Sequence, residues 1–112
     1  MSEQERFARA LQKLLRYAYE QDIDVLMYQL YRTTEQQKAL YDAKKSKADG
    51  TLKKSMHQLG RAADIAIVRA GNVIWENCEE YHKLAGFWKS IGGKWGGDFS
   101  TTQYSDIYHF EI

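Results

Sequence analysis

The sequence is poor in residues that stiffen or cross-link a chain. Its 112 residues include no proline and one cysteine, Cys78, so an internal disulfide is excluded. It also lacks internal repeats and low-complexity tracts. A chain of this length is expected to form one domain, residues 1–112, held together by packing or with the help of a bound metal.

Long apolar runs are absent as well. No segment approaches the roughly 20 apolar residues that span a bilayer, and the opening residues, MSEQERFARA, are too charged for a signal peptide. We therefore expect synthesis in the cytoplasm without a signal peptide, and no membrane insertion. A marked excess of one charge is missing too. The formal net charge is +1, which gives no reason to expect nucleic acid as a partner.

What the chain does contain is typical of a globular protein. Hydrophobic residues make up 44% and aromatic residues 13%, which is enough for a packed core. Three helices are predicted from capping boxes, in which a Ser, Thr or Asn is followed three positions later by Glu or Gln. The boxes are Ser2/Glu5, Thr33/Gln36 and Asn77/Glu80, and the helices are expected over 3–20, from 33 to about 41, and from 77 to the glycines at 92 and 93.

Strands are predicted from apolar runs and turn residues. The nearly continuous apolar run 23–31 predicts a strand buried on both faces, and 62–68 and 73–75 predict a hairpin around the turn 69–72. A last strand is expected over 108–112, and 42–54, with five lysines, is expected to be a loop. Because helices and strands do not alternate regularly, we expect an α+β fold with a small, mainly antiparallel sheet and about three helices.

Three residues form a candidate metal site: His57, Asp64 and His109. Imidazole and carboxylate are good zinc ligands, and three of them leave a fourth position for water, as a hydrolytic site needs. Strand alternation places Asp64 on the same face as Ala62 and Ala66. A carboxylate among alanines is costly unless it is paired or bound to metal.

Asp106 lies three residues before His109, so on a regular strand the two would face opposite ways. Asp106 must therefore lie in a loop or bulge if both are to reach one water molecule. Glu111 would share the strand face of His109 and could orient it, although a surface strand residue has the same pattern. Cys78 and His82 are four apart on the third predicted helix, but no further ligand pair accompanies them.

Three segments together resemble one known family. The pattern Ser-x-His-x-x-Gly-x-Ala-x-Asp over 55–64, the pair Asp106-x-x-His109, and Tyr31-Arg32-Thr33 followed by Gln37 resemble the zinc D-alanyl-D-alanine carboxypeptidases. That family includes vancomycin-resistance dipeptidases and phage L-alanyl-D-glutamate endolysins, and it shares its fold with the hedgehog signalling domain. The run 94–99, KWGGDF, is most similar to the endolysin branch. The similarity extends from about residue 31 to the end.

The resemblance implies a role for each matching residue. His57, Asp64 and His109 would bind Zn²⁺, and Asp106 would act as the general base. Arg32 would stabilise the oxyanion or hold a substrate carboxylate, and Ser55 would support the site or contact substrate. The implied activity is that of a phage or prophage endolysin, which hydrolyses L-alanyl-D-glutamate in peptidoglycan stem peptides. We expect a monomer that acts on the cell wall, in the periplasm, after its release from the cytoplasm.

Several alternatives remain open from the sequence alone. Carboxypeptidase or dipeptidase action on D-alanyl-D-alanine is the enzymatic alternative, and a non-catalytic, zinc-stabilised binding module is the other. Asp106 could be a loop acid, and Arg32 could form a structural salt bridge. Trp95 could belong to the core or line a cleft. The lysines of 42–54 could be solvated or attract anionic cell-envelope polymers.

Overall fold

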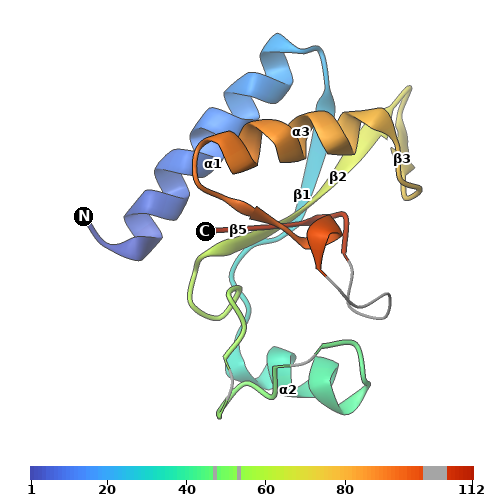
Figure 1. Ribbon diagram of the computed structural model, residues 1–112. Coiled ribbons are helices and arrows are strands. Elements are labelled where there is room, and N and C mark those ends of the chain that lie inside the picture. The colour runs from blue at the N-terminus through green and yellow to red at the C-terminus, as the bar shows by residue number, and fades with distance from the viewer. Residues whose placement is uncertain (47, 53, 100–105) are drawn as a thin grey trace.

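The computed structural model describes residues 1–46, 48–52, 54–99 and 106–112. The helices are α1 (Glu3–Glu20), α2 (Thr34–Asp42) and α3 (Glu79–Ser90), with a 3-10 turn η1 (Gly96–Asp98). The strands are β1 (Asp24–Gln29), β2 (Ala62–Arg69), β3 (Asn72–Ile74), β4 (Lys94–Trp95) and β5 (His109–Glu111). Figure 1 shows α1 and α3 close together and α2 apart from them.

The five strands form one antiparallel sheet in the order β1-β2-β5-β4. The first residues of β2, 62–64, pair with β5, and its last residues, 67–69, pair with β3. β5 and β3 therefore lie one after the other along the same edge of β2. The hairpin between β2 and β3 turns at Ala70 and Gly71, whose positive φ angles of 53° and 81° suit a tight two-residue turn. The predicted α+β class with a mainly antiparallel sheet is confirmed.

The core lies between one face of the sheet and the two helices α1 and α3. Phe7 of α1 meets the buried Trp88 of α3 edge to face, with 6.1 Å between ring centroids. Trp88 also donates a hydrogen bond of 2.9 Å from Nε1 to the carbonyl of Glu111 in β5. Ile65 and Ile67 of β2 join this core. The alternating residue Asp64 therefore points to the other face of the sheet, away from α1 and α3.

The helix starts at α1 and α2 were predicted correctly, and the start of α3 was not. Ser2/Glu5 and Thr33/Gln36 both form complete capping boxes. The N-cap of α3 is Cys78, one residue later than the predicted Asn77, and its side chain makes no capping hydrogen bond. Asn77 is thus displaced from the position where an amide side chain could reach the first free N–H groups of the helix.

The expectation that the first strand is buried on both faces was wrong. β1 is shorter than the predicted 23–31 and lies at the edge of the sheet, where it pairs only with β2. Leu26, Met27 and Tyr28 consequently keep 40% to 45% of their surface exposed. The short elements β4 and η1 were not predicted from the sequence. Trp95 of β4 belongs to the core and is buried. No helix in the described ranges has the length and apolar character needed to cross a bilayer.

Candidate metal centre

His57 is fixed in its loop by hydrogen bonds on both sides. Its Nδ1 lies 2.8 Å from the carbonyl oxygen of Leu30, which can only accept, so Nδ1 donates and Nε2 is left facing Asp64. The carbonyl of His57 accepts from the backbone N–H of Arg32 at 3.1 Å. The loop turns back into β2 through Gly60, whose φ of +68° suits glycine. A buried imidazole is thereby presented with a free Nε2.

Strand pairing brings Asp64 and His109 together. The antiparallel register of β2 and β5 places Asp64 directly opposite His109, although 45 positions separate them in the chain. Nε2 of His109 donates to Oε1 of Glu111 at 2.7 Å, which leaves Nδ1 of His109 facing Asp64. Glu111 thus orients His109, as the sequence pattern suggested for a residue on the same strand face.

The three side chains fit a metal ion. His57 Nε2 lies 3.2 Å and His109 Nδ1 3.6 Å from Oδ1 of Asp64, and one ligand atom from each residue lies within 4.8 Å of the others. Tetrahedral zinc with bonds of about 2.0–2.2 Å needs ligand atoms about 3.3–3.6 Å apart. Among the described residues no other group of three or more His, Cys, Asp and Glu side chains is arranged in this way. Cys78 and His82 therefore belong to no such group.

The oxygen at the centre of this group has no hydrogen-bond partner. Asp64 is 7% exposed, and its Oδ1 is buried without a hydrogen bond. A buried carboxylate oxygen left in this way is costly. Burial raises the pKa of Asp64, but the facing imidazoles of His109 and His57 outweigh that effect and lower the pKa to about 2. A cation placed between the three side chains would satisfy the free oxygen, so the donor set fits zinc.

His109 holds its proton strongly when no metal competes for it. Burial lowers the pKa of His109, but Asp64 and Glu111 on either side of the ring outweigh burial and raise the pKa to about 9. A zinc ion has to displace that proton, because only a neutral imidazole nitrogen can bind metal.

Asp106 lies beside the three candidate metal ligands and is not one of them. It precedes a turn that leads into β5, where the N–H of His109 donates to the Asp106 carbonyl at 3.2 Å, so the required bend before the strand is present. Its Oδ1 accepts from the N–H of Tyr108 at 3.0 Å. Burial and the negative charge of Asp64 raise the pKa of Asp106. Asp106 is not one of the clustered candidate ligands.

Gly96 was not recognised from the sequence as part of this site. The N–H of Asp106 donates to the Gly96 carbonyl at 3.0 Å. A Cβ on Gly96 would lie 2.2 Å from the Asp106 carbonyl oxygen and 2.8 Å from Cβ of His109. Only glycine allows the two segments to approach so closely. Trp95 supports the same turn by donating from Nε1 to the carbonyl of Ile107 at 2.8 Å.

Arg32 faces Asp64 from the other direction. Its Nη2 lies 3.7 Å from Oδ2 of Asp64, and its Nη1 donates to Oε1 of Gln37 at 2.6 Å. Burial lowers the pKa of Arg32, and the charges of Asp64 and Asp106 oppose that effect. Nε of Arg32 is buried without a hydrogen-bond partner, so this guanidinium keeps a free donor. The ion pair with Asp64 agrees with the alternative that Arg32 forms a structural salt bridge. Its unpaired Nε would gain a partner if a ligand reached it.

The comparisons with known proteins agree with this geometry. A family model described as D-alanyl-D-alanine carboxypeptidase matches residues 49–112, a range that contains His57, Asp64, Asp106 and His109. The chain belongs to the D-alanyl-D-alanine carboxypeptidase family. The family predicted from the three sequence segments is therefore confirmed.

Relatives within and around the family share much of the chain. The L-alanyl-D-glutamate peptidase of Listeria phage A118 is 36% identical over 93 residues, which is 81% of this chain and 32% of the phage protein. This chain thus spans about a third of that relative's length. The crystal structure of the L-Ala D-Glu endopeptidase ChiX of Serratia marcescens has a TM-score of 0.76 and 24% identity, covering 96% of this chain and 78% of that one.

A second solved structure has the same fold. The vancomycin resistance D,D-pentapeptidase VanY, in complex with Zn(II), has a TM-score of 0.64 at 22% identity and covers 96% of this chain and 70% of that one. At such identities the similarity with VanY and ChiX concerns the fold alone.

Ser55, another residue of the family pattern, has a local role in this chain. Its Oγ accepts from the N–H of Gln58 at 3.3 Å, and its own N–H donates to Oε1 of Gln58 at 3.0 Å. Gln58 also donates from Nε2 to the carbonyl of Gly50 at 3.0 Å. Ser55 therefore helps to shape the loop that carries His57.

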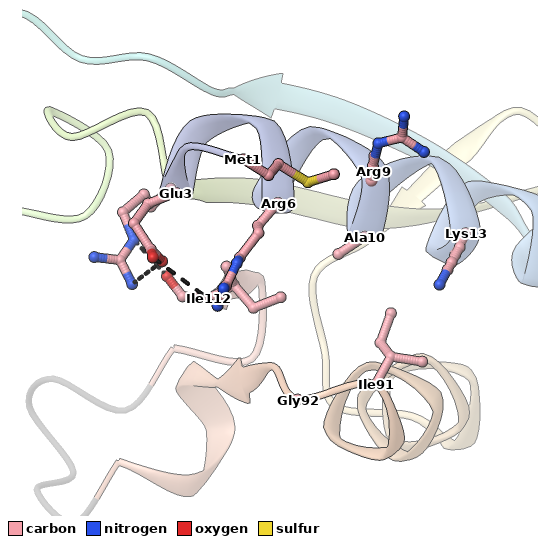
Figure 2. A pocket seen from close by; sticks show the side chains of 10 residues that line it. Met1, Glu3, Arg6, Arg9, Ala10, Lys13, Ile91, Gly92 and Ile112 are labelled. Atoms are coloured by element: carbon pink, nitrogen blue, oxygen red, sulfur yellow. Dashed lines mark hydrogen bonds and ion pairs between the residues drawn. The ribbon is translucent and has the colours of Figure 1, made fainter.

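A separate hollow of about 460 Å³ lies between α1, the end of α3 and the C-terminal residue. Figure 2 shows Arg6 and Lys13 pointing toward the gap beside Ile91, whereas Arg9 points away from it. Arg6 and Arg61 are both held by Glu3, at 4.0 and 3.4 Å. None of the predicted site residues lines this hollow, which is therefore distinct from the candidate metal centre.

Proposed function

We propose that this chain is a zinc-dependent peptidoglycan peptidase that cleaves the L-alanyl-D-glutamate bond of stem peptides. The proposal rests on one observation: His57, Asp64 and His109 form a group that could bind a metal, and the carboxylate of Asp106 lies next to this group without belonging to it. A structural zinc site needs no free acid next to the metal, whereas a hydrolytic one does. The choice of bond follows the Listeria phage relative and ChiX, both of which are named as peptidases of this bond.

Each side chain has a defined part in the proposed reaction. Zinc, held by His57, Asp64 and His109, would supply a Lewis acid that polarises the scissile carbonyl and acidifies water. Asp106 takes a proton from the attacking water and delivers it to the nitrogen of the leaving amine. Its raised pKa suits this double role, because the group has to accept a proton and then release it. Arg32, whose guanidinium lies beside Asp64, would stabilise the developing oxyanion or hold a substrate carboxylate.

The runner-up is hydrolysis of D-alanyl-D-alanine ends. It is favoured by the description of the matching family and by a VanY structure in complex with D-alanine-D-alanine, which has a TM-score of 0.62 at 24% identity. A non-catalytic, zinc-stabilised binding module is the remaining alternative. We further propose that residues 1–112 act as one domain and as a monomer, and that the substrate is met at the cell wall.

Digestion of purified peptidoglycan tests the proposal. The zinc-loaded protein is incubated with the polymer, and the new amino and carboxyl ends are identified by mass spectrometry. New C-terminal L-alanine together with new N-terminal D-glutamate is the expected result. Release of D-alanine would establish the runner-up. Absence of any new ends from several peptidoglycan types, with zinc bound, would establish the binding module.

A further inference from the structure

Three aromatic side chains from separate segments meet at the surface beside the metal centre. They are Tyr28 of β1, Trp75 directly after β3, and Tyr108 in the turn before β5, and we call them the ring cluster. The ring centroids of Trp75 lie 5.7 Å from Tyr28 and 5.4 Å from Tyr108, and those of the two tyrosines lie 6.5 Å apart. β1 and the pair β3 and β5 flank β2 on opposite sides, so the rings meet across β2.

The ring cluster is exposed and held in place. Trp75 is 53% exposed and Tyr28 45%, whereas the other two tryptophans of the chain are buried. Tyr108 packs edge to face on the fully buried Tyr81, at 5.6 Å, and its hydroxyl donates to the carbonyl of Trp75. An apolar surface that the fold keeps rigid and open to water is a typical binding surface, because little conformational freedom is lost when a ligand covers it.

The ring cluster adjoins the proposed catalytic residues. The backbone N–H of Tyr108 donates to Oδ1 of Asp106, and Tyr108 immediately precedes His109. Burial raises the pKa of Tyr28, and the charges of Asp64 and Asp106 raise it further, so both carboxylates act on its hydroxyl. A substrate held at the metal centre would therefore extend over or past these rings.

The charges around the ring cluster favour a neutral occupant. Two carboxylates lie next to the rings in the chain or in space: Oδ1 of Asp106 accepts from the N–H of Tyr108 at 3.0 Å, and Glu76 directly follows Trp75. An anionic part of the substrate would be repelled there and would find its counter-charge at Arg32 instead. The ligand that suits the rings is neutral, with an apolar face for stacking and polar groups at its rim.

We propose that the ring cluster binds the N-acetylated sugar ring to which the stem peptide is attached. This rests on the proposed L-alanyl-D-glutamate specificity, because in that substrate only one alanine separates the cut bond from the muramyl lactyl group. At about 3.5 Å per extended residue, the sugar has to lie within about 10 Å of the metal centre. The amidated sugar is neutral, and its C–H face, hydroxyls and acetamido group match an aromatic surface with polar tips.

The test compares one peptide with and without its sugar. The zinc-loaded protein hydrolyses either the disaccharide-linked stem peptide or the same peptide with an N-acetylated first alanine. Trp75→Ala should raise KM for the sugar-linked substrate about tenfold and leave kcat unchanged. A tenfold change corresponds to a loss of about 1.4 kcal/mol of binding free energy. KM for the sugar-free peptide should not change. Trp75→Phe should restore most of the effect, and Tyr19→Ala, which changes an 85% exposed ring on α1, should have none.

Two results would overturn the assignment. Equal changes for both substrates would mean that Trp75 contacts the peptide or supports the fold, and unchanged kinetics for both would mean that the rings bind nothing. A second arm does not depend on hydrolysis. Titration of the zinc-loaded protein with an N-acetylglucosamine tetramer should change the emission of Trp75, and Trp75→Phe should remove that change. Failure to hydrolyse either substrate, with sugar binding intact, would count against the proposed function and leave the sugar site standing.

Discussion

Replacement of Gly96 by alanine should displace the proposed base, Asp106, without changing its side chain. The added Cβ would lie 2.2 Å from the Asp106 carbonyl oxygen and 2.8 Å from Cβ of His109, whereas real Cβ contacts stay beyond 3.0 Å. The turn carrying Asp106 therefore has to shift by the order of 1 Å. A displacement of that size at a reacting group costs about 10²-fold in rate.

The same overlap predicts a smaller effect on folding. Forcing an extra methyl group into a tightly packed position costs about 1–3 kcal/mol, so Gly96→Ala should lower the free energy of unfolding by that amount. Zinc should still bind, because His57 and Asp64 are not among the nearest neighbours of the added Cβ, but it should bind more weakly because His109 is. The measurements are hydrolysis of peptidoglycan, zinc content and urea unfolding.

Gly86→Ala is the matched control. Gly86 lies inside α3, and a Cβ there would meet nothing within 4 Å. Because alanine favours a helix over glycine, this variant should be more stable by about 0.5–1 kcal/mol and should keep the wild-type rate. The reasoning is refuted if Gly96→Ala hydrolyses peptidoglycan at the wild-type rate, or if both variants lose activity equally.

Four further predictions follow from the buried polar contacts. Glu111→Gln should weaken zinc binding about 10–100-fold, measured by competition with a chelator, because a carboxylate that holds a metal-binding His contributes about that much. Zinc affinity should rise with pH up to about pH 9, since the raised pKa of His109 means that a proton competes with the metal below that value. In the metal-free protein the same shift stabilises the fold below about pH 6.5, and this contribution is lost as the pH rises through about 9, so a stability that increases over this window would contradict it. Gln37→Ala should lower the free energy of unfolding, measured in urea, by about 1–3 kcal/mol. The reason is that Nη1 of Arg32 and the carbonyl of Ala48 both lose the buried side chain with which they form hydrogen bonds.

Local signals in the sequence predicted most of the helices and the hairpin. Ser2 and Thr33 cap helices because the bonds involved span only three residues. The exposure of β1 could not be predicted in this way. An apolar run does not reveal whether a strand lies at the centre or the edge of a sheet, since that depends on which strands pair with it. Its edge position is also what allows Tyr28 to reach Trp75 at the surface.

The site was predicted in part for the same reason. The sequence motifs named His57, Asp64 and His109 together, and their meeting depends on a register between β2 and β5 that no local pattern specifies. Gly96 was not recognised as part of the site, because its close approach to Asp106 exists only in the folded chain. Lys47 and Lys53 of the predicted lysine-rich loop lie outside the described residues.

The Asp106→Asn variant tests the central claim most directly. Asparagine keeps the shape of the side chain and cannot take a proton from water. Zinc content and peptidoglycan hydrolysis are measured on the same preparation, beside the wild-type protein. We expect full zinc content and a loss of turnover of about 10²- to 10⁴-fold, the usual contribution of a positioned acid–base group. Wild-type turnover with full zinc content would contradict the assignment of Asp106 as the base, and loss of zinc would make it a metal ligand in a closed, structural site.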